Sequence, residues 1–277
     1  MLTRPDVAAT TDYQAQLLAS NCGHLDAAAL LRRVISHELA GRIALVSSFG
    51  SESAVLLDMV ARINLTVPVL FLNTGKLFGE TLRYRDELVA RLRLTDVREI
   101  GPRRDEIEPV DANGMLWSSD PDRCCYLRKV APLHQALDGF DGWITGRKRF
   151  QSAARARLSR IEAAEGRIKI NPLADWGRDD IEGYFAEYGL PPHPLEADGF
   201  PSIGCIPCTD RAAHAEEARD GRWRGQAKTE CGIHTRLATN VRSEPVRTWR
   251  RSVATAASSA LKLGNASSET VEGGQPG

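Results

Sequence analysis

Hydrophobic and polar positions follow one another in blocks along the chain, and each block has the length of one helix or one strand. Apolar residues recur at helical spacing over residues 26–39, 54–63 and 79–94. Two short, uninterrupted apolar runs, residues 43–46 and 67–72, have the composition of strands that are buried on both faces. This alternation predicts an α/β fold, in which helices cover both faces of a parallel sheet.

A small, polar loop connects the first predicted strand to the helix that follows it. The loop reads Ser47-Ser-Phe-Gly-Ser-Glu-Ser53. A strand, a loop of small residues and a helix start together favour anion binding, because unpaired amides and the helix dipole face the ligand. The loop lacks the lysine of a Walker A motif and the glycine spacing of a dinucleotide-binding fold. Taken alone, it is equally typical of a tight connection whose hydroxyls cap the helix.

Cysteine spacing carries the clearest chemical information. Cys124 and Cys125 are adjacent, and Cys205 and Cys208 form a Cys-x-x-Cys pair far downstream. Neighbouring side chains point in different directions, so an adjacent pair reaches one centre only with an unusual backbone or with a centre larger than one ion. These four cysteines therefore favour an iron-sulfur cluster over tetrahedral zinc or a set of buried thiols. Cys22 has no metal-like neighbours, and we expect an ordinary buried or half-buried thiol.

Composition limits the function classes. The 277 residues are 42% hydrophobic and 26% charged, with 36 basic and 36 acidic residues, which fits one or two compact domains. Residues 1–40 lack a basic segment followed by an apolar stretch, and no run approaches a membrane span. We expect a cytoplasmic protein, where thiols stay reduced, without a membrane or nucleic acid as its partner.

Several motifs together resemble one enzyme family. They are Ser47-Ser-Phe-Gly-Ser-Glu-Ser53, Phe71-Leu-Asn-Thr-Gly75 with Leu77-Phe78 and Glu80-Thr81, Cys124-Cys-Tyr-Leu-Arg-Lys-Val130, Trp143-Ile-Thr-Gly146 with Arg149 and Gln151-Ser152, Asn171-Pro-Leu-Ala-Asp-Trp176, Gly204-Cys-Ile-Pro-Cys208 and Glu230-Cys-Gly-Ile-His234. Over about residues 40 to 235 the chain is similar to the adenylyl-sulfate (APS) and phosphoadenylyl-sulfate (PAPS) reductases of sulfate assimilation and cysteine biosynthesis. The resemblance implies an adenine-nucleotide alpha-hydrolase-like fold with a modified P-loop. It also implies reduction of adenosine 5'-phosphosulfate to sulfite and AMP.

The resemblance extends to the cofactor and the partners. Within the family, four cluster cysteines accompany the enzymes that mainly use adenylyl sulfate, so this chain is expected to hold a 4Fe-4S cluster and to prefer APS over PAPS. The expected cluster ligands are Cys124, Cys125, Cys205 and Cys208. Thioredoxin or a similar dithiol is the expected reductant, and a homo-oligomer is possible.

Cys231 is the candidate nucleophile. It lies between Lys228 and His234, and a thiolate is the reactive form of cysteine. We expect Cys231 to attack the sulfur of the substrate, giving an enzyme S-sulfocysteine that a dithiol then cleaves. His234 would help to bind the sulfo oxygens or the leaving phosphate, unless it is a solvated or capping side chain. Lys129 is implied to lie between cluster and substrate.

The remaining candidate residues would bind the substrate. Guanidinium groups suit the oxygens of a phosphosulfate, and the resemblance implies this role for Arg149 in the basic stretch 147–157 and for two arginines before Trp223. The full set of expected substrate-binding residues is Ser47, Ser48, Phe49, Gly50, Ser51, Glu52, Thr74, Gly75, Arg149, Arg219 and Arg222.

Four segments follow from this assignment. Residues 1–40 are expected to form an N-terminal helical segment, and 41–200 a nucleotide-binding α/β domain. Residues 201–240 would be the Cys-rich cluster and catalytic segment, mobile because Cys231 must serve the nucleotide and then a protein reductant. Residues 241–277 are a C-terminal extension whose later part, rich in small polar residues, should be disordered.

Two functions of other classes compete with this interpretation. A modified-P-loop enzyme that adenylates tRNA and transfers sulfur would use ATP, but its usual Ser-Gly-Gly-x-Asp-Ser loop is not matched by residues 48–53. A non-catalytic iron-sulfur nucleotide sensor would keep the cluster ligands and the loop. It would not need Glu230-Cys-Gly-Ile-His234.

Overall fold

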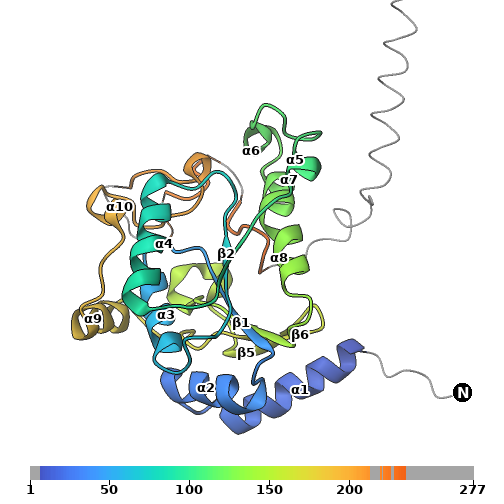
Figure 1. Cartoon of the computed structure of the whole chain (residues 1–277), viewed down its shortest axis with the longest axis vertical. Coiled ribbons are helices and arrows are strands. Elements are labelled where there is room, and N and C mark those ends of the chain that lie inside the picture. Colours follow the sequence, from blue (N-terminus) through green and yellow to red (C-terminus); the bar gives the residue numbers. More distant parts are fainter. Residues whose placement is uncertain (1–6, 213–218, 220, 226–227, 235–277) are drawn as a thin grey trace, which may run out of the picture. The chain divides into compact units, whose positions relative to one another are not determined.

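The structure, a computed structural model, describes residues 7–212, 219, 221–225 and 228–234. In this part of the chain six strands form one sheet in the order β3-β2-β1-β4-β6-β5 (Figure 1). All neighbouring strands run parallel except β5, which is antiparallel to β6. The strands are β1 (Ile43–Ser47), β2 (Val69–Leu72), β3 (Val97–Ile100), β4 (Gly142–Ile144), β5 (Ile161–Ala164) and β6 (Arg167–Ile170).

Helices and helical turns connect the strands. The α-helices are α1 (Val7–Cys22), α2 (Ala27–Arg33), α3 (Ser53–Ala61), α4 (Gly79–Leu92), α5 (Arg104–Ile107), α6 (Leu116–Ser119), α7 (Pro121–Cys125), α8 (Ala131–Ala136), α9 (Arg178–Tyr188) and α10 (Pro194–Ala197). The other helical turns are η1 (Val34–Glu38), η2 (Tyr126–Val130), η3 (Arg149–Gln151), η4 (Ala153–Arg155) and η5 (Ile206–Cys208). Among the described elements, η1 and η2 are π-helical and the rest of this second group are 3-10 turns.

The two faces of the sheet carry separate apolar clusters, because alternate residues of each strand point to opposite faces. On β1, Leu45 belongs to the larger cluster, which includes residues of α2, α3 and α4. Its neighbour Val46 belongs to the smaller cluster, which includes Leu133 of α8. Figure 1 accordingly shows α3 and α4 on one side of the sheet and α8 on the other. The predicted sandwich of helices around a parallel sheet is confirmed.

The strand order places a crossing point beside β1. From β1 the chain adds β2 and β3 on one side, and it later returns to add β4 and β6 on the other. Loops that leave the carboxyl ends of β1 and β4 therefore diverge, and ligands of α/β sheets bind in the crevice that this opens. The predicted anion-binding loop follows β1, so the topology puts it at that crevice.

Helix boundaries agree with the sequence pattern except where the helix itself changes type. Asp26 accepts a 2.7 Å hydrogen bond from the amide of Ala29 and so caps α2. The helix expected over residues 26–39 continues only to Arg33 as α-helix and then widens into the π-turn η1. Apolar spacing does not distinguish the two helix types over one turn, because a single π-turn shifts the register by only one residue.

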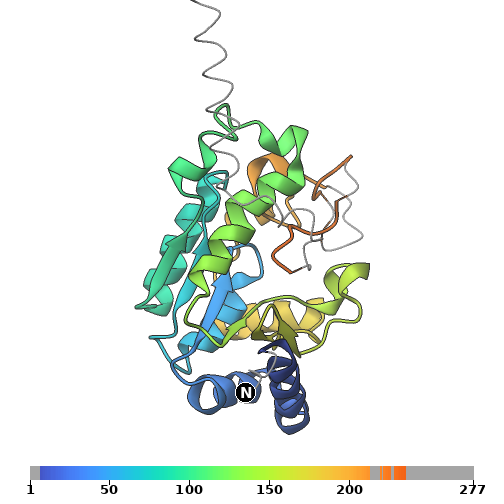
Figure 2. The same ribbon diagram turned by 90° about the vertical axis from the view of Figure 1, so that its right-hand side faces the viewer.

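The N-terminal helix lies at one edge of the sheet. The N-terminal helix α1, dark blue in Figure 2, packs on β5 and β6, the edge of the sheet farthest from β3. The division into four segments stays a prediction, and the extension 241–277 lies outside the described residues. None of the described helices is both long and apolar enough to cross a membrane.

Candidate active site

The loop after β1 is held in a tight conformation by an aromatic side chain in the core. Phe49 has φ 49°, in the left-handed region that non-glycine residues rarely adopt. Its ring is fully buried and packs edge-on against Phe71 of β2, with ring centroids 5.2 Å apart. The amide of Phe49 donates to the hydroxyl of Ser47 at 3.1 Å. Core packing thus fixes the backbone that leads into α3.

A cavity of about 210 Å³ lies at the carboxyl ends of β1, β2 and β4. It is lined by residues from the loop after β1, from the loop after β4 and from the Cys-rich C-terminal region of the described chain. Of the predicted site residues, Ser47, Ser48, Gly50, Ser51, Glu52, Thr74, Lys129, Arg219, Arg222, Cys231 and His234 line it. Residues that are far apart in the sequence thus meet around one space.

Positive charge dominates the wall of this cavity. Among the described residues its lining contains six lysine or arginine side chains: Lys129, Arg147, Lys148, Arg155, Arg219 and Arg222. Glu52 is the one acidic residue in this described part of the lining. An excess of guanidinium and ammonium groups in a partly desolvated space attracts a multiply charged anion. The cavity therefore suits a phosphate or sulfate ester better than a neutral ligand.

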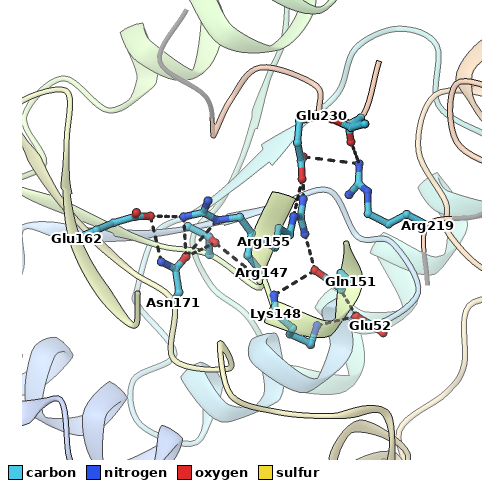
Figure 3. Close-up of polar contacts among 11 residues, drawn as sticks. Glu52, Arg147, Lys148, Gln151, Arg155, Glu162, Asn171, Arg219 and Glu230 are labelled. Carbon is cyan, nitrogen blue, oxygen red and sulfur yellow. Dashed lines mark hydrogen bonds and ion pairs between the residues drawn. The ribbon is translucent and has the colours of Figure 1, made fainter. Parts of the chain in front are cut away.

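An inner group of polar residues joins the loop after β1 to the loop after β4 (Figure 3). The ammonium of Lys148 lies 2.6 Å from Oε2 of Glu52, and the amide of Gln151 donates to the same oxygen at 2.7 Å. Burial lowers the pKa of Lys148, and the carboxylate of Glu52 opposes that change. The ammonium also donates to the carbonyl of Gly146 at 3.0 Å. These contacts fix the two loops against each other.

The segment that carries Cys231 is anchored by the residue before it. Glu230 accepts hydrogen bonds from Nε and Nη2 of Arg155 at 2.6 and 2.9 Å (Figure 3). Arg219 approaches the same carboxylate at 3.6 Å and donates to the carbonyl of Thr229 at 3.2 Å. Burial raises the pKa of Glu230, but the hydrogen bonds and charge of Arg155 outweigh it, and the net pKa is lowered. Glu230 is therefore an ionised anchor.

Beyond Cys231 the chain enters the smaller apolar cluster. Ile233 packs against that cluster, and the ring of His234 stacks on Trp143 of β4 with centroids 5.6 Å apart and planes 7° from parallel. Burial lowers the pKa of His234 well below its ordinary value, and the cations Arg147 and Lys169 lower it further. Its Nδ1 is buried and has no hydrogen-bond partner among the described residues. A neutral imidazole thus has one nitrogen for a ligand.

Two further arginines flank Trp223. The guanidinium carbons of Arg219 and Arg222 lie 5.2 and 4.5 Å from the centroid of its indole ring. Arg222 uses Nε to donate to the carbonyl of Cys208 at 3.0 Å, while no hydrogen bond joins its terminal nitrogens to another of the described residues. Because both arginines line the cavity, Trp223 serves as the platform that directs them.

Three of the predicted substrate-binding residues lie outside the lining of the cavity. The ring of Phe49 is in the core, as described above. Gly75 forms a turn after β2 in which its amide donates to the side chain of Asn73 at 3.0 Å. Arg149 turns away to pair with Asp175 and donates from Nε to the carbonyl of Leu158 at 2.9 Å. Their roles in binding stay predictions.

The four candidate cluster ligands border a second, small cavity. Cys124, Cys125, Cys205 and Cys208 are all buried and carry free thiols. Cys124 and Cys125 end α7, and the π-helical turn η2 begins at the next residue, which is the unusual backbone that an adjacent pair requires. Thr74 contributes a hydroxyl 3.2 Å from the sulfur of Cys205.

This donor set fits an iron-sulfur cluster. Four thiols facing one cavity from two chain segments, with cations beside them, are the ligands and counter-charges that such a cluster uses. Among the described residues, no three His, Cys, Asp or Glu side chains are grouped closely enough to hold a single metal ion. The arrangement is thus compatible with the cluster that the sequence predicts, whose presence stays a proposal.

Lys129 lies between the two cavities and lines both. Burial acts to lower the pKa of its ammonium. The sulfurs of Cys205, Cys231 and Cys125 overcome that effect and raise the pKa above its ordinary value. Lys129 is therefore protonated at neutral pH and contributes a positive charge to the wall of both cavities.

The whole constellation matches one known family. Residues 42–211 match the phosphoadenosine phosphosulfate reductase domain. The chain belongs to this reductase family. The match covers the sheet, the loop after β1 and all four candidate cluster cysteines, and it ends before the segment that carries Cys231.

Relatives named as reductases resemble the chain over most of its length. A protein of Mesorhizobium japonicum named adenosine 5'-phosphosulfate reductase is 49% identical over 76% of this chain and 84% of its own. One of the same name from Chelativorans sp. is 45% identical over 80% of this chain and 91% of its own. A phosphoadenosine 5'-phosphosulfate reductase of Gloeobacter violaceus is 40% identical over 70% and 82%.

A solved structure of the same family has the same fold. The phosphoadenylyl-sulfate reductase of Candida auris, in a phosphate complex, superposes with a TM-score of 0.60 at 27% identity. The match covers 71% of this chain and 96% of that one. The adenine-nucleotide alpha-hydrolase-like fold expected from the sequence is thus confirmed for this family member.

Sequence reasoning missed the residues that hold this reductase site together. Lys148, Gln151 and Arg155 belong to a basic stretch in which only Arg149 was given a binding role, yet these three face the cavity or its anchors. The sequence held no signal for their direction: Ser152 between the turns η3 and η4 is extended, so the four-residue spacing from Gln151 to Arg155 is not the spacing of a helix face. Glu230 also went unassigned, because an acidic residue beside a nucleophile has no distinctive pattern.

Proposed function

We propose that this chain is an adenylyl-sulfate reductase that converts adenosine 5'-phosphosulfate to sulfite and AMP. The observation that carries the proposal is that Cys231 lines the same cationic cavity as the loop after β1. A nucleophilic thiol and an anion-binding loop around one space are what a thiol attack on a nucleotide sulfate ester requires. The names of the relatives support the same activity.

The first step is attack on sulfur. The thiolate of Cys231 forms a bond to the sulfur of the sulfo group, the bond from that sulfur to the bridging oxygen breaks, and AMP leaves with the electron pair. Arg219, Arg222 and Lys129 would hold the anionic oxygens, since a thiolate approaches the sulfur only if their charge is neutralised. His234, neutral and stacked on Trp143, would offer Nδ1 to an oxygen of the same group.

The second step returns the enzyme to its thiol form. A dithiol of the thioredoxin type attacks the sulfur of Cys231 in the S-sulfocysteine and displaces sulfite, which carries away the electron pair of the sulfur-sulfur bond. The second thiol of the reductant then resolves the mixed disulfide. Two electrons pass from the dithiol to the sulfo sulfur, so no electron is needed from a metal.

Four cysteines would hold a 4Fe-4S cluster in the second cavity: Cys124, Cys125, Cys205 and Cys208. When bound, the cluster supplies structure and a fixed charge field beside the substrate. Lys129 would lie between that field and the sulfo group and carry a compensating positive charge. The proposed setting is the cytoplasm, where thiols such as the six free cysteines remain reduced.

Sulfite release by anaerobically purified, iron-loaded protein with thioredoxin tests this function. We expect sulfite from adenosine 5'-phosphosulfate and none from C231S, which should still bind the nucleotide and the iron. Full turnover by C231S would refute the thiol mechanism. Failure of the wild-type chain to release sulfite from either nucleotide would favour a sulfur transferase or a nucleotide sensor instead.

The 3'-phosphorylated nucleotide is the second candidate substrate. It is favoured by the similarity to the Gloeobacter violaceus and Candida auris proteins, which are both named as reductases of that compound. The two nucleotides should be compared at matched concentrations in the same assay. A higher kcat/KM for the 3'-phosphorylated form would change the substrate and leave the mechanism intact.

A further inference from the structure

Arg155 directs every polar group of its guanidinium at protein partners. Nε and Nη2 make the two hydrogen bonds to Glu230, and Nη1 donates to Oε1 of Gln151 (Figure 3). The side chains of Arg155 and Glu230 are each only 9% exposed. A bidentate guanidinium-carboxylate pair in such a place has fixed geometry and is only weakly screened by salt. Arg155 lines the cavity, but each of its three nitrogens already donates to a protein partner.

The pair connects the sheet side of the site to the nucleophile. Arg155 belongs to η4, which follows β4, and Glu230 immediately precedes Cys231. Gln151 accepts a hydrogen bond from Arg155 and donates one to Glu52. The ion pair of Arg155 and Glu230 is thereby connected to the loop after β1. Rotation or withdrawal of the chain at Cys231 cannot occur without breaking these contacts.

Resting on the proposed function, we propose that Arg155 is a positioning residue, which seats Cys231 in the cavity by holding Glu230. Arg155 does not bind the substrate. The ion pair fixes the distance between the thiol and the anion site, and its opening releases the segment toward a protein reductant. A nucleophile that must face two partners in turn needs a fastening of this kind, strong enough to orient the attack and reversible.

The exposure of the Cys231 thiol tests the seating without any need for turnover. The full-length, iron-loaded proteins R155Q, E230Q and R155E/E230R would be treated with iodoacetamide, and alkylation of the Cys231 peptide would be followed by mass spectrometry. We expect Cys231 of both single variants to react at least about tenfold faster than in the wild type. In the swapped pair R155E/E230R its rate should be closer to that of the wild type than to those of the single variants. Rates compared at their alkaline plateau exclude a changed thiolate fraction.

Kinetics separate positioning from substrate binding. In R155Q and E230Q we expect kcat to fall about tenfold or more, while the Kd for adenosine 5'-phosphosulfate, measured in a C231S background, changes less than about threefold. R155K keeps the charge but not the bidentate geometry, so its kcat should lie between those of R155Q and the wild type. R42Q is the control, because the pair of Arg42 and Asp141 lies at the amino ends of β1 and β4, away from the cavity at their carboxyl ends.

Three outcomes would overturn the inference. Alkylation of both single variants at the R42Q rate would show that the pair does not seat the thiol. A Kd that weakens as much as kcat falls would make Arg155 a substrate ligand. A swapped pair that is alkylated as fast as R155Q and E230Q would exclude the ion pair as the cause. If the wild type releases no sulfite, the proposed function fails, but the alkylation rates still test whether the ion pair positions Cys231. Melting temperatures identify any variant that is unfolded.

Discussion

The guanidinium of Arg222 lies directly over the backbone of Gly204. A Cβ atom at residue 204 would stand 2.3 Å from Nη2 and 2.5 Å from the guanidinium carbon. No side chain larger than hydrogen fits while Arg222 keeps this position. Gly204 also lines the cavity next to the ligand Cys205 proposed above, so the glycine decides where a cationic group of the active site can rest.

Replacement of Gly204 by alanine should therefore weaken substrate binding without unfolding the protein. The clashing atoms are the far end of a flexible side chain, so Arg222 can move aside at little cost to stability. Loss of one charge-assisted contact to the sulfo group corresponds to about 1.5–3 kcal/mol, or roughly a tenfold or greater rise in Kd. Calorimetric titration of adenosine 5'-phosphosulfate into G204A/C231S and C231S measures it.

G183A is the matched control for this substitution. Gly183 lies in α9, and a Cβ there meets no atom within 4 Å. Its affinity for the nucleotide should equal that of the parent. If G204A also bound the nucleotide with unchanged Kd, Arg222 would not be a substrate ligand.

Glu52 should matter for stability as well as for binding. Its carboxylate accepts from the buried ammonium of Lys148, and E52Q would leave that ammonium without its counter-charge. Breaking one partner of a buried pair costs about 3–5 kcal/mol, which the partial exposure of Glu52 reduces to about 2 kcal/mol. Urea unfolding at neutral pH should show this loss.

The exposed pair between Arg33 and Glu38 provides the comparison. Their side chains are 51% and 31% exposed, so E38Q should change the free energy of unfolding by less than about 1 kcal/mol. Equal effects of E52Q and E38Q would contradict the view that the Lys148 pair is a buried structural element of the site.

Patterns that depend on one chain segment were readable from the sequence, and contacts between segments were not. The apolar run of β1 and the polar loop after it define strand, loop and helix locally, and the structure has all three. The strand order was not readable in this way, since it depends on β4 pairing with the side of β1 that β2 leaves free. The hydrophobic pattern of a strand is the same whichever strand lies beside it.

Individual site residues show the same limit. Cys231 and His234 stand out by their spacing, and they line the cavity. Arg149 and Arg155 are both basic residues of one short stretch, and only the tertiary structure turns one outward to Asp175 and the other inward to Glu230. The sequence shows which residues are charged, but whether a side chain points into the cavity or away from it depends on short turns such as η3 and η4.

Lys129 is expected to act on turnover more than on the iron content. It lines both cavities and interacts electrostatically with the sulfurs of Cys205 and Cys231, so its charge acts on the substrate cavity as well as on the cysteine cavity. K129A should lower kcat/KM at least about tenfold, equivalent to about 1.4 kcal/mol, while iron per chain stays close to that of the wild type. Iron analysis and sulfite assays on the same preparation decide between the roles, because parallel losses of iron and activity would mean a ligand-support role only.

His193 should make the fold sensitive to acid. It is almost fully buried, its Nδ1 accepts from the amide of Leu195 at 3.2 Å, and Nε2 lies 3.1 Å from the hydroxyl of Thr81. These partners satisfy a neutral imidazole protonated on Nε2. Burial lowers the pKa of His193 to about 4, against an opposing effect of Glu80.

Between pH 6.5 and pH 4 the unfolded chain therefore binds a proton at this histidine that the folded chain does not bind. Stability falls as the pH drops through that range, by about 2 kcal/mol at pH 5 relative to neutral pH. H193N keeps an acceptor for the amide of Leu195 but cannot titrate, so its stability relative to the wild type should improve by about that amount on going from pH 7.5 to pH 5. Parallel stability curves for H193N and the wild type would mean that His193 already accepts a proton in the folded protein, which its two hydrogen-bond partners do not allow without rearrangement.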